Sequence, residues 1–171
     1  MNFLEQLTGE WFTYKGYFVR TNIKMNKRSK GGWDNELDVL AYSAKEGELI
    51  HVESSWDALT WAQRKERFLK KKFVYKHEEY EALVGAKIFR LRRMALVGLG
   101  WSAKTPSDLA WGDGIEVVLI PHFIAAIGKQ LAGKDPLKDV VPEGFPRLRA
   151  IQLALRYGIG HMSTQNTEVA R

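Results

Sequence analysis

The chain of 171 residues contains no cysteine, which excludes disulfide bonds, zinc thiolate sites and cysteine nucleophiles. It also lacks any apolar stretch near the roughly 20 residues that cross a bilayer. The longest apolar run, EVVLIPHFIAAIG, is interrupted by Pro121 and His122 and is typical of a buried strand that turns into a helix. The opening residues, MNFLEQLTGEWF, carry no basic leader before an apolar run, unlike a secretory signal. We therefore expect a cytoplasmic protein with no membrane partner.

The chain contains enough apolar residues to form a hydrophobic core. Hydrophobic residues make up 45% of the chain and aromatic residues 12%, which excludes disorder over most of its length. A chain of this size favours one domain, residues 1–171, over two. The 26 lysines and arginines outnumber the 20 acids and give a net charge of +6, which suits a polyanionic partner such as nucleic acid.

The spacing of apolar residues predicts alternating helices and strands. Helices are expected over residues 2–14, 57–72 with Asp57 as N-cap, 77–85, 122–133 and 147–159. Strands are expected over 17–25, 36–42, 48–54, 87–98 and 114–121, with a proline-containing loop over 135–146 and a polar tail over 159–171. This order favours an α/β fold with one central mixed sheet flanked by helices.

Asp38 and Glu53 stand inside two of these strand segments, ELDVLAY and ELIHVES, where a buried charge is costly without a partner. In an antiparallel hairpin the two positions lie at the same end, so their carboxylates converge. Converging acids repel each other unless they share a proton or hold a cation, and Mg²⁺ prefers carboxylate oxygen. The alternative is a pair of edge acids balanced by arginine or lysine on neighbouring strands.

The segments TGEWFTYKGYFVRTNI, NELDVLAY and ELIHVES resemble the restriction-endonuclease-like nucleases of the PD-(D/E)XK superfamily. The resemblance covers roughly the first 75 residues and implies a restriction-endonuclease-like fold. It assigns the acid of the first helix to Glu10, the strand acid to Asp38 and the acid before the motif lysine to Glu53. It further implies Mg²⁺ or Mn²⁺ held by Asp38, Glu53 and the carbonyl of Ser54, and a DNA phosphodiester as substrate.

The chain departs from this family at the motif lysine, which is replaced by Ser55. A serine hydroxyl can hydrogen-bond a water molecule, but it has no positive charge to favour the deprotonated form of that water. Some members of the superfamily supply this charge from elsewhere. The candidates expected near this end of the sheet are Lys24, Gln63, Arg64 and Lys65.

The basic residues give the expected nucleic-acid contacts. Positive side chains crowd the outer surface predicted for the helix over residues 57–72, from Arg64 to Lys72, and a second cluster surrounds Arg92. We predict contacts with nucleic acid, and with DNA in particular, for the following residues: Lys24, Arg64, Lys65, Lys71, Arg90 and Arg92. Trp33, Trp56, Trp61 and Trp111 either stack on bases or pack in the core, the second being the commoner role.

Three functions follow as hypotheses. The first is a Mg²⁺-dependent nuclease with Glu10, Asp38, Glu53 and Ser55 at its active site, for which a homodimer is a natural arrangement because cutting two strands calls for two sites. The second is a catalytically degenerate nuclease fold that serves as a DNA-binding or interaction module. The third is an unrelated small-molecule-binding domain whose basic surface only aids solubility.

Overall fold

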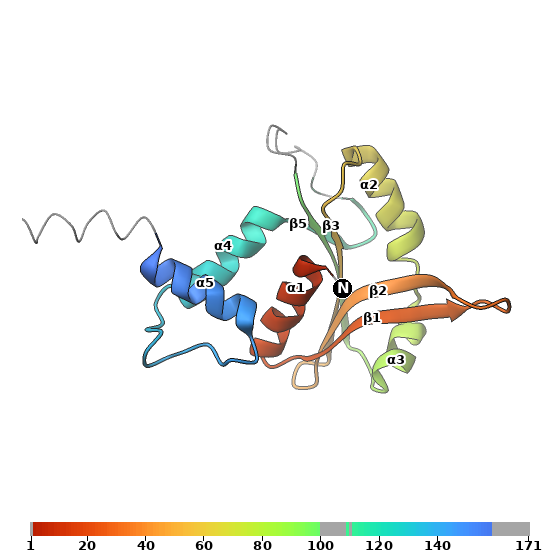
Figure 1. Cartoon of the computed structure of the whole chain (residues 1–171). Coiled ribbons are helices and arrows are strands. Elements are labelled where there is room, and N and C mark those ends of the chain that lie inside the picture. The colour runs from red at the N-terminus through yellow and green to blue at the C-terminus, as the bar shows by residue number, and fades with distance from the viewer. Residues whose placement is uncertain (1, 100–108, 110, 159–171) are drawn as a thin grey trace, which may run out of the picture. The chain divides into compact units, whose positions relative to one another are not determined.

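Five strands in one mixed sheet form the centre of the first of two compact units. The computed structural model describes residues 2–99, 109 and 111–158, so the tail predicted over residues 159–171 lies outside the described residues. The chain divides into two compact units between Pro121 and His122, and each unit is described by itself. The expectation of an α/β fold is confirmed in the first unit, where helices flank the sheet (Figure 1).

The strands follow each other across the sheet in chain order, from β1 to β5. Neighbouring strands β1, β2 and β3 are antiparallel, whereas β4 runs parallel to β3 and β5 runs parallel to β4. The sheet is therefore mixed and has β3 and β4 near its centre. The strand bounds are Phe18–Lys27 for β1, Trp33–Ser43 for β2, Glu48–Ser55 for β3, Arg90–Val97 for β4 and Ile115–Leu119 for β5.

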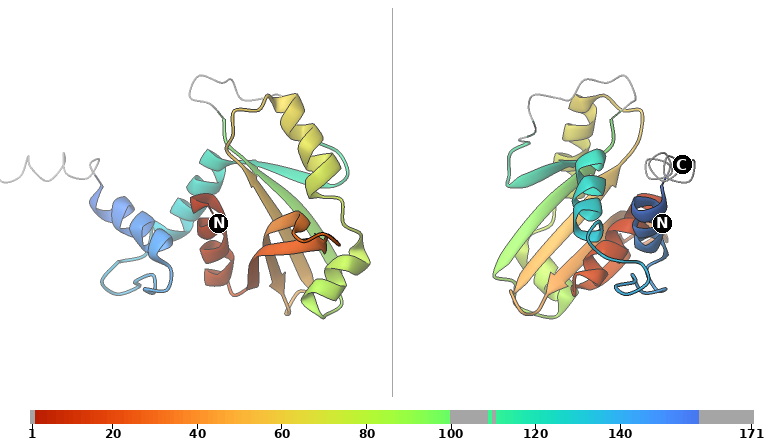
Figure 2. Two further views of the ribbon diagram at one scale, coloured as in Figure 1. Left: turned by 45° about the vertical axis from the view of Figure 1, so that its right-hand side comes forward. Right: turned by 90° about the vertical axis from the view of Figure 1, so that its left-hand side faces the viewer.

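Helices cover both faces of this sheet (Figure 2). Helix α1 (Phe3–Tyr14) lies on one face, where Gly9 allows a close approach: a Cβ there would come within 3.4 Å of the Thr21 side chain. The other face carries α2 (Trp61–Arg67), η1 (Phe68–Lys72) and α3 (His77–Val84). The buried side chains of Leu40, Leu49 and Tyr80 form part of one core cluster on that face.

The predicted helix over residues 57–72 begins and ends differently from the expectation. Its N-cap is Thr60, whose side chain accepts a hydrogen bond from the Gln63 amide, so the assignment of Asp57 as N-cap was wrong. After Arg67 the helix widens into one π-helical turn, η1, in which the Phe73 amide donates to the Phe68 carbonyl at 3.0 Å. Phe68 and Phe73 are both buried, and a spacing of five residues faces the core twice only if the turn holds an extra residue.

The second unit contains most of α4 (Ile120–Leu131) and all of α5 (Pro146–Tyr157). The intervening proline-containing segment is a loop, as predicted. Gln152 of α5 fastens it, because its side-chain oxygen accepts from the Val141 amide at 2.9 Å and its amide group donates to the Asp139 carbonyl at 2.9 Å. In the part of the chain that is described, no helix is long and apolar enough to cross a membrane.

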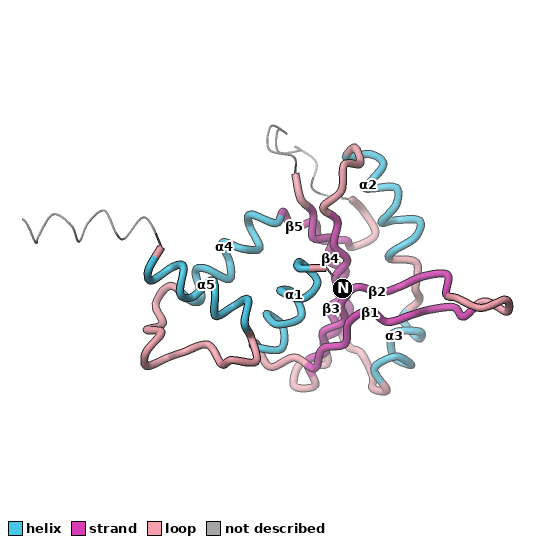
Figure 3. The backbone as a smooth tube through the Cα atoms, viewed as in Figure 1, coloured by secondary structure: helices cyan, strands magenta, loops and turns pink. Residues whose placement is uncertain are grey.

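The β1–β2 hairpin extends beyond the point where β2 stops pairing with β3. Strand β2 pairs with β3 only from Val39 to Ser43, whereas its pairing with β1 continues to the Lys27–Trp33 pair. The outer half of the hairpin is therefore a two-stranded ribbon, and it projects on the side of the sheet that carries α2 and α3 (Figures 1 and 3).

Candidate active site

Asp38 and Glu53 meet where strands β2 and β3 separate. The ladder between these strands ends at the Val39–Val52 pair, and side chains replace it beyond that point. The Asp38 amide donates to Glu53 Oε1 at 3.2 Å, and the Ser54 amide and hydroxyl donate to Asp38 Oδ2 at 2.9 and 3.1 Å. We call this place, where β2 and β3 diverge beyond the Val39–Val52 pair, the fork. The two acids satisfy backbone donors that the divergence would leave unpaired, and they lie at the same end of the hairpin, as expected.

Lys72 supplies the cation between these acids. Its Nζ lies 2.5 Å from Glu53 Oε2 and 3.3 Å from Asp38 Oδ1. The sequence periodicity places Lys72 on the outer surface of a regular helix, and this prediction was wrong. The π-turn of η1 inserts one residue before Lys72, and because each helical residue turns the chain by about 100°, the side chain is rotated toward the sheet.

Burial dominates the electrostatics of this group. It raises the pKa of Glu53 to about 7 even though Lys72 opposes the shift. Burial and the neighbouring Glu53 charge also raise the pKa of Asp38. Burial alone would lower the pKa of Lys72, but the Glu53 and Asp38 carboxylates together outweigh it and raise that pKa. The ammonium therefore stays charged, and it is the positive charge that compensates two acids removed from water.

Two buried side chains, His51 and Tyr80, form a chain of hydrogen bonds that ends at Glu53. His51 Nδ1 lies 2.8 Å from the Tyr80 hydroxyl, and His51 Nε2 lies 2.8 Å from Glu53 Oε1. Burial lowers the pKa of His51 to about 3 and raises the pKa of Tyr80 to about 12, so the ring is neutral and the phenol keeps its proton. The hydroxyl then donates to Nδ1, and Nε2 carries the ring proton and donates to the Glu53 carboxylate.

His51 was not among the site residues predicted from the sequence. The signal for its role was its position two residues before Glu53, because residues i and i+2 of a strand share a face of the sheet. Tyr80 had no comparable signal, since its helix is distant in sequence. Lys72 likewise could be found only through the π-turn.

The first helix, α1, carries two acids, Glu5 and Glu10. Glu5 is buried and accepts a hydrogen bond from the Asn2 amide at 3.0 Å in a capping box. Burial raises the pKa of Glu5, and the Asp38 carboxylate adds to this rise. Glu10 lies five residues, or about 7.5 Å, further along the helix and is half-buried. The pKa of Glu5 thus responds to the charge of Asp38, whereas the assignment of Glu10 to the site stays a prediction.

Ser55, which was predicted to replace a motif lysine, belongs to a separate network. Its hydroxyl donates to Asp57 Oδ2 at 2.8 Å and accepts from Arg67 Nη2 at 2.9 Å. Arg67 also forms an ion pair with Asp57 at 2.8 Å. The positive charge next to Ser55 is therefore already neutralised, and Lys72 is the cation in contact with Asp38 and Glu53.

The other candidates for the missing charge lie elsewhere. Arg64 is buried and donates to the carbonyls of Gly98 and Asp57, each at 2.8 Å. Gln63 takes part in the α2 capping box. Lys24 is exposed and pairs with Glu36 on the hairpin. None of the hydrogen bonds or ion pairs that the structure gives for these side chains, within the described residues, reaches Asp38 or Glu53.

Two of the predicted nucleic-acid contacts, Arg90 and Arg92, lie away from the acids. Arg90 pairs with Glu48 at 3.2 Å and Arg92 with Glu116 at 2.6 Å. Glu48 begins β3, five residues or about 16 Å before Glu53, so these arginines lie at the opposite end of the strand. Lys71 is exposed and lines a groove of about 290 Å³ together with Arg67 and Lys70, whereas Lys65 is half-buried.

The tryptophans divide between core and surface. Trp111 is buried and packs edge-on against Phe68 with ring centroids 5.2 Å apart, and Trp61 packs against Trp111 at 5.1 Å. Trp33 and Trp56 are exposed. Of these four tryptophans, Trp33 and Trp56 therefore have the rings most accessible to a partner.

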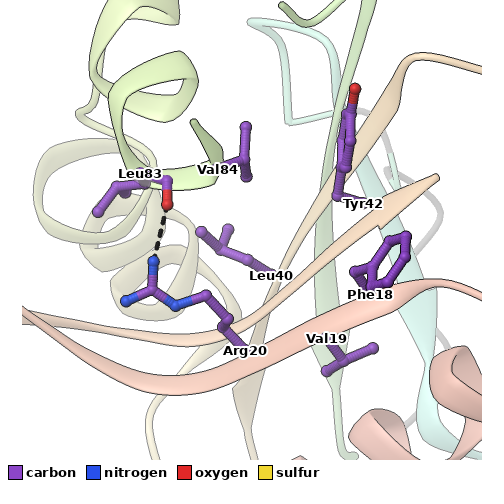
Figure 4. Close-up of a pocket in the computed structure, with 7 residues that line it drawn as sticks. All are labelled: Phe18, Val19, Arg20, Leu40, Tyr42, Leu83 and Val84. Atoms are coloured by element: carbon purple, nitrogen blue, oxygen red, sulfur yellow. Dashed lines mark hydrogen bonds between the residues drawn. The ribbon is translucent and has the colours of Figure 1, made fainter. Parts of the chain in front are cut away.

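A separate cavity of about 490 Å³ opens between α3 and strands β1 and β2 (Figure 4). Its walls include Leu40 and Tyr42, and the Arg20 guanidinium crosses it to donate to the Leu83 carbonyl at 2.7 Å. Among the described residues, no carboxylate, histidine or lysine lines it. The cavity is larger than the groove beside Lys71 but brings no acid or base together, so the candidate site is the fork.

The donor set at the fork is smaller than that of a complete all-side-chain metal centre. Across residues 2–99, 109 and 111–158, no group of three or more histidine, aspartate or glutamate side chains is arranged to hold a metal ion. Two carboxylate oxygens, Asp38 Oδ1 and Glu53 Oε2, nevertheless face one cationic nitrogen. No protein-family model, curated protein or solved structure matches the chain.

Proposed function

We propose that the protein is a metal-dependent nuclease of the restriction-endonuclease-like kind, in which Lys72 replaces the motif lysine. The single observation that carries this proposal is the fork itself, where Asp38 and Glu53 leave two diverging strands and converge on the ammonium of Lys72. The element order supports it: a helix, three antiparallel strands, a helical segment and a strand parallel to β3 agree with the resemblance in the first 75 residues.

The residues at the fork fit a hard cation. Asp38 Oδ2 and Glu53 Oε1 are occupied by hydrogen bonds from the strands and from His51. Glu53 Oε2 is buried and accepts no hydrogen bond of ordinary geometry, although Lys72 Nζ lies close to it. Asp38 and Glu53 would hold the ion, with the Ser54 carbonyl as the third protein ligand implied by the resemblance. A bound Mg²⁺ or Mn²⁺ would polarise a phosphoryl oxygen and lower the pKa of a water molecule.

The chain's own side chains then have separate tasks. Lys72 brings a fixed positive charge to the place where negative charge develops on a phosphoryl group, which is the electrostatic contribution that Ser55 lacks. The side chain of Lys72 is 25% exposed, so it is only partly removed from solvent. His51 and Tyr80 fix the orientation of Glu53 so that Oε2, and not Oε1, faces the cation.

A second candidate is supported by the same contacts. The Lys72 ammonium closes both acids into one ion pair, and the acids complete the backbone hydrogen bonds of the fork. Such a group can exist for stability alone. The fold would then be a degenerate nuclease that binds DNA without cutting it.

Cleavage assays separate the two candidates. Wild-type protein, Asp38→Asn, Lys72→Met and the control Lys45→Met would be incubated with plasmid and single-stranded DNA in Mg²⁺ or Mn²⁺. Lys45 is exposed in the turn between β2 and β3, at the end of β2 away from Asp38. We expect cleavage by the wild type and the control, and a loss of about 100-fold or more in the two site variants. DNA binding without cleavage by the wild type under both metals would select the degenerate fold, and cleavage by Asp38→Asn at the wild-type rate would overturn the site.

A further inference from the structure

The outer half of the β1–β2 hairpin is a free two-stranded ribbon that the proposed chemistry does not use. Strand β2 has no β3 partner between Trp33 and Asp38, while β1 pairs with it along that length. Four residue steps separate Trp33 from Leu37, which corresponds to about 13 Å of ribbon. Gly31 and Gly32, both with positive φ, close its tip. The ribbon is long and narrow, and its tip is exposed (Figures 1 and 3).

The charge of this ribbon is positive and concentrated at the tip. Residues 24–36 contain four basic side chains and two acids, a net charge of +2 from 4 − 2. Both acids already form ion pairs within the ribbon, Asp34 with Arg28 and Glu36 with Lys24. Lys27 and Lys30 are exposed and form no ion pair with any described residue. Two positive charges are therefore available at the tip.

The exposed ring of Trp33 lies beside these charges. It is 45% exposed and stands opposite Lys27 in the β1–β2 register. Asp38 lies on the same strand, five residues or about 16 Å from Trp33. A polyanion held by the tip can thus extend along β2 to the acids at the fork.

The shape of the ribbon selects among polyanions. The major groove of B-form DNA is about 12 Å wide and admits a two-stranded ribbon. The major groove of an A-form RNA duplex is too narrow for side chains to enter, and a single strand has no groove. Resting on the proposed nuclease function for its ligand class, we propose that residues 24–36 are an arm that enters the major groove of duplex DNA, with Lys27 and Lys30 on its phosphates.

Binding measured without metal tests this arm. Fluorescence anisotropy in EDTA would compare a labelled DNA duplex, an RNA duplex of the same sequence and the single DNA strand over a salt series. The variant is Lys27→Gln with Lys30→Gln. Its matched control, Lys45→Gln with Lys87→Gln, removes two exposed lysines at the other end of the sheet. Because all four side chains are exposed, thermal unfolding should match that of the wild type, which checks folding.

We expect the tip variant to bind duplex DNA about tenfold more weakly or worse, and its slope of log affinity against log salt to fall by about 1.8. RNA duplex and single-strand binding should fall less, and the control should match the wild type. An equal loss on all three ligands, an unchanged affinity for duplex DNA, or displacement by a minor-groove competitor would each overturn the arm. Because no metal is present, these results stand whether or not the protein cleaves DNA, so failure of the nuclease proposal remains distinguishable.

Discussion

Replacing Lys72 by methionine tests the charge arrangement of the fork. The substitution removes the cation in contact with Asp38 and Glu53 while keeping a long apolar stem. The side chain of Glu53 is 0% exposed and that of Lys72 is 25% exposed. Removing one partner of a buried ion pair costs about 3–5 kcal/mol, and since Lys72 keeps part of its hydration we expect the lower end, about 3 kcal/mol. Urea unfolding at neutral pH measures this loss.

The pH dependence gives a sharper signature. The pKa of Glu53 is about 7 in the folded chain against a reference of 4.5. A raised acid pKa means that stability falls as pH rises from 4.5 to about 7 and is constant above. Without Lys72 the pKa of Glu53 in the folded chain moves higher. The free energy of unfolding then continues to fall beyond pH 7, at about 1.4 kcal/mol per pH unit. His51 changes stability in the opposite sense and only between about pH 3 and 6.5, so it does not contribute there.

The matched control is Lys72→Met combined with Glu53→Gln, which removes the acid together with its cation. This double variant should recover part of the lost stability and show no extra loss between about pH 7 and 8.5. A Lys72→Met variant that is as stable as the wild type and has the same pH dependence would refute the role of Lys72 as the compensating charge. Lys72 would then not compensate the buried acids, and the proposed nuclease would have no replacement for the motif lysine.

Three further outcomes are expected. Glu5→Gln should weaken Mn²⁺ binding by about tenfold, as loss of a supporting carboxylate does, whereas Glu10→Gln should leave it unchanged in the same calorimetric titration. Tyr80→Phe should destabilise the fold by about 1 kcal/mol and weaken Mn²⁺ binding about tenfold, and an unaltered Mn²⁺ affinity in the folded variant would mean that the tyrosine does not position Glu53. Because protons compete at Glu53, whose pKa is about 7, Mn²⁺ affinity should rise about tenfold per pH unit below pH 7 and level off above it; a flat profile would contradict a role for Glu53 as ligand.

The sequence was informative where local rules decide the structure. The alternation in ELDVLAY and ELIHVES predicted two strands, and the geometry of an antiparallel hairpin then brought Asp38 and Glu53 to the same end. The strands, the helices and the loop before α5 were likewise predicted, with small differences at their ends. These features depend on neighbours in the chain.

The rest of the site depends on contacts between distant segments. Glu5 lies on the buried face of α1 with Thr8 and Phe12, whereas the apolar Phe3 is 61% exposed, so residue type alone does not identify this face. Lys72 was assigned to solvent because a period of 3.6 residues describes an α-helix and fails over a π-turn.

The π-turn also makes chain length in η1 a determinant of where one charge points. Residues Phe68 to Lys72 complete a turn with one residue more than an α-helix uses. Deleting Lys70 or Lys71 would restore the regular period and swing the following side chains by about 100°, which turns the Lys72 ammonium away from the carboxylates. Substitutions at Lys70 or Lys71, which are both exposed, keep the residue count and should be tolerated. These two positions should therefore accept a change of residue type and reject a deletion, a pattern that a deletion scan set against a substitution scan would display directly.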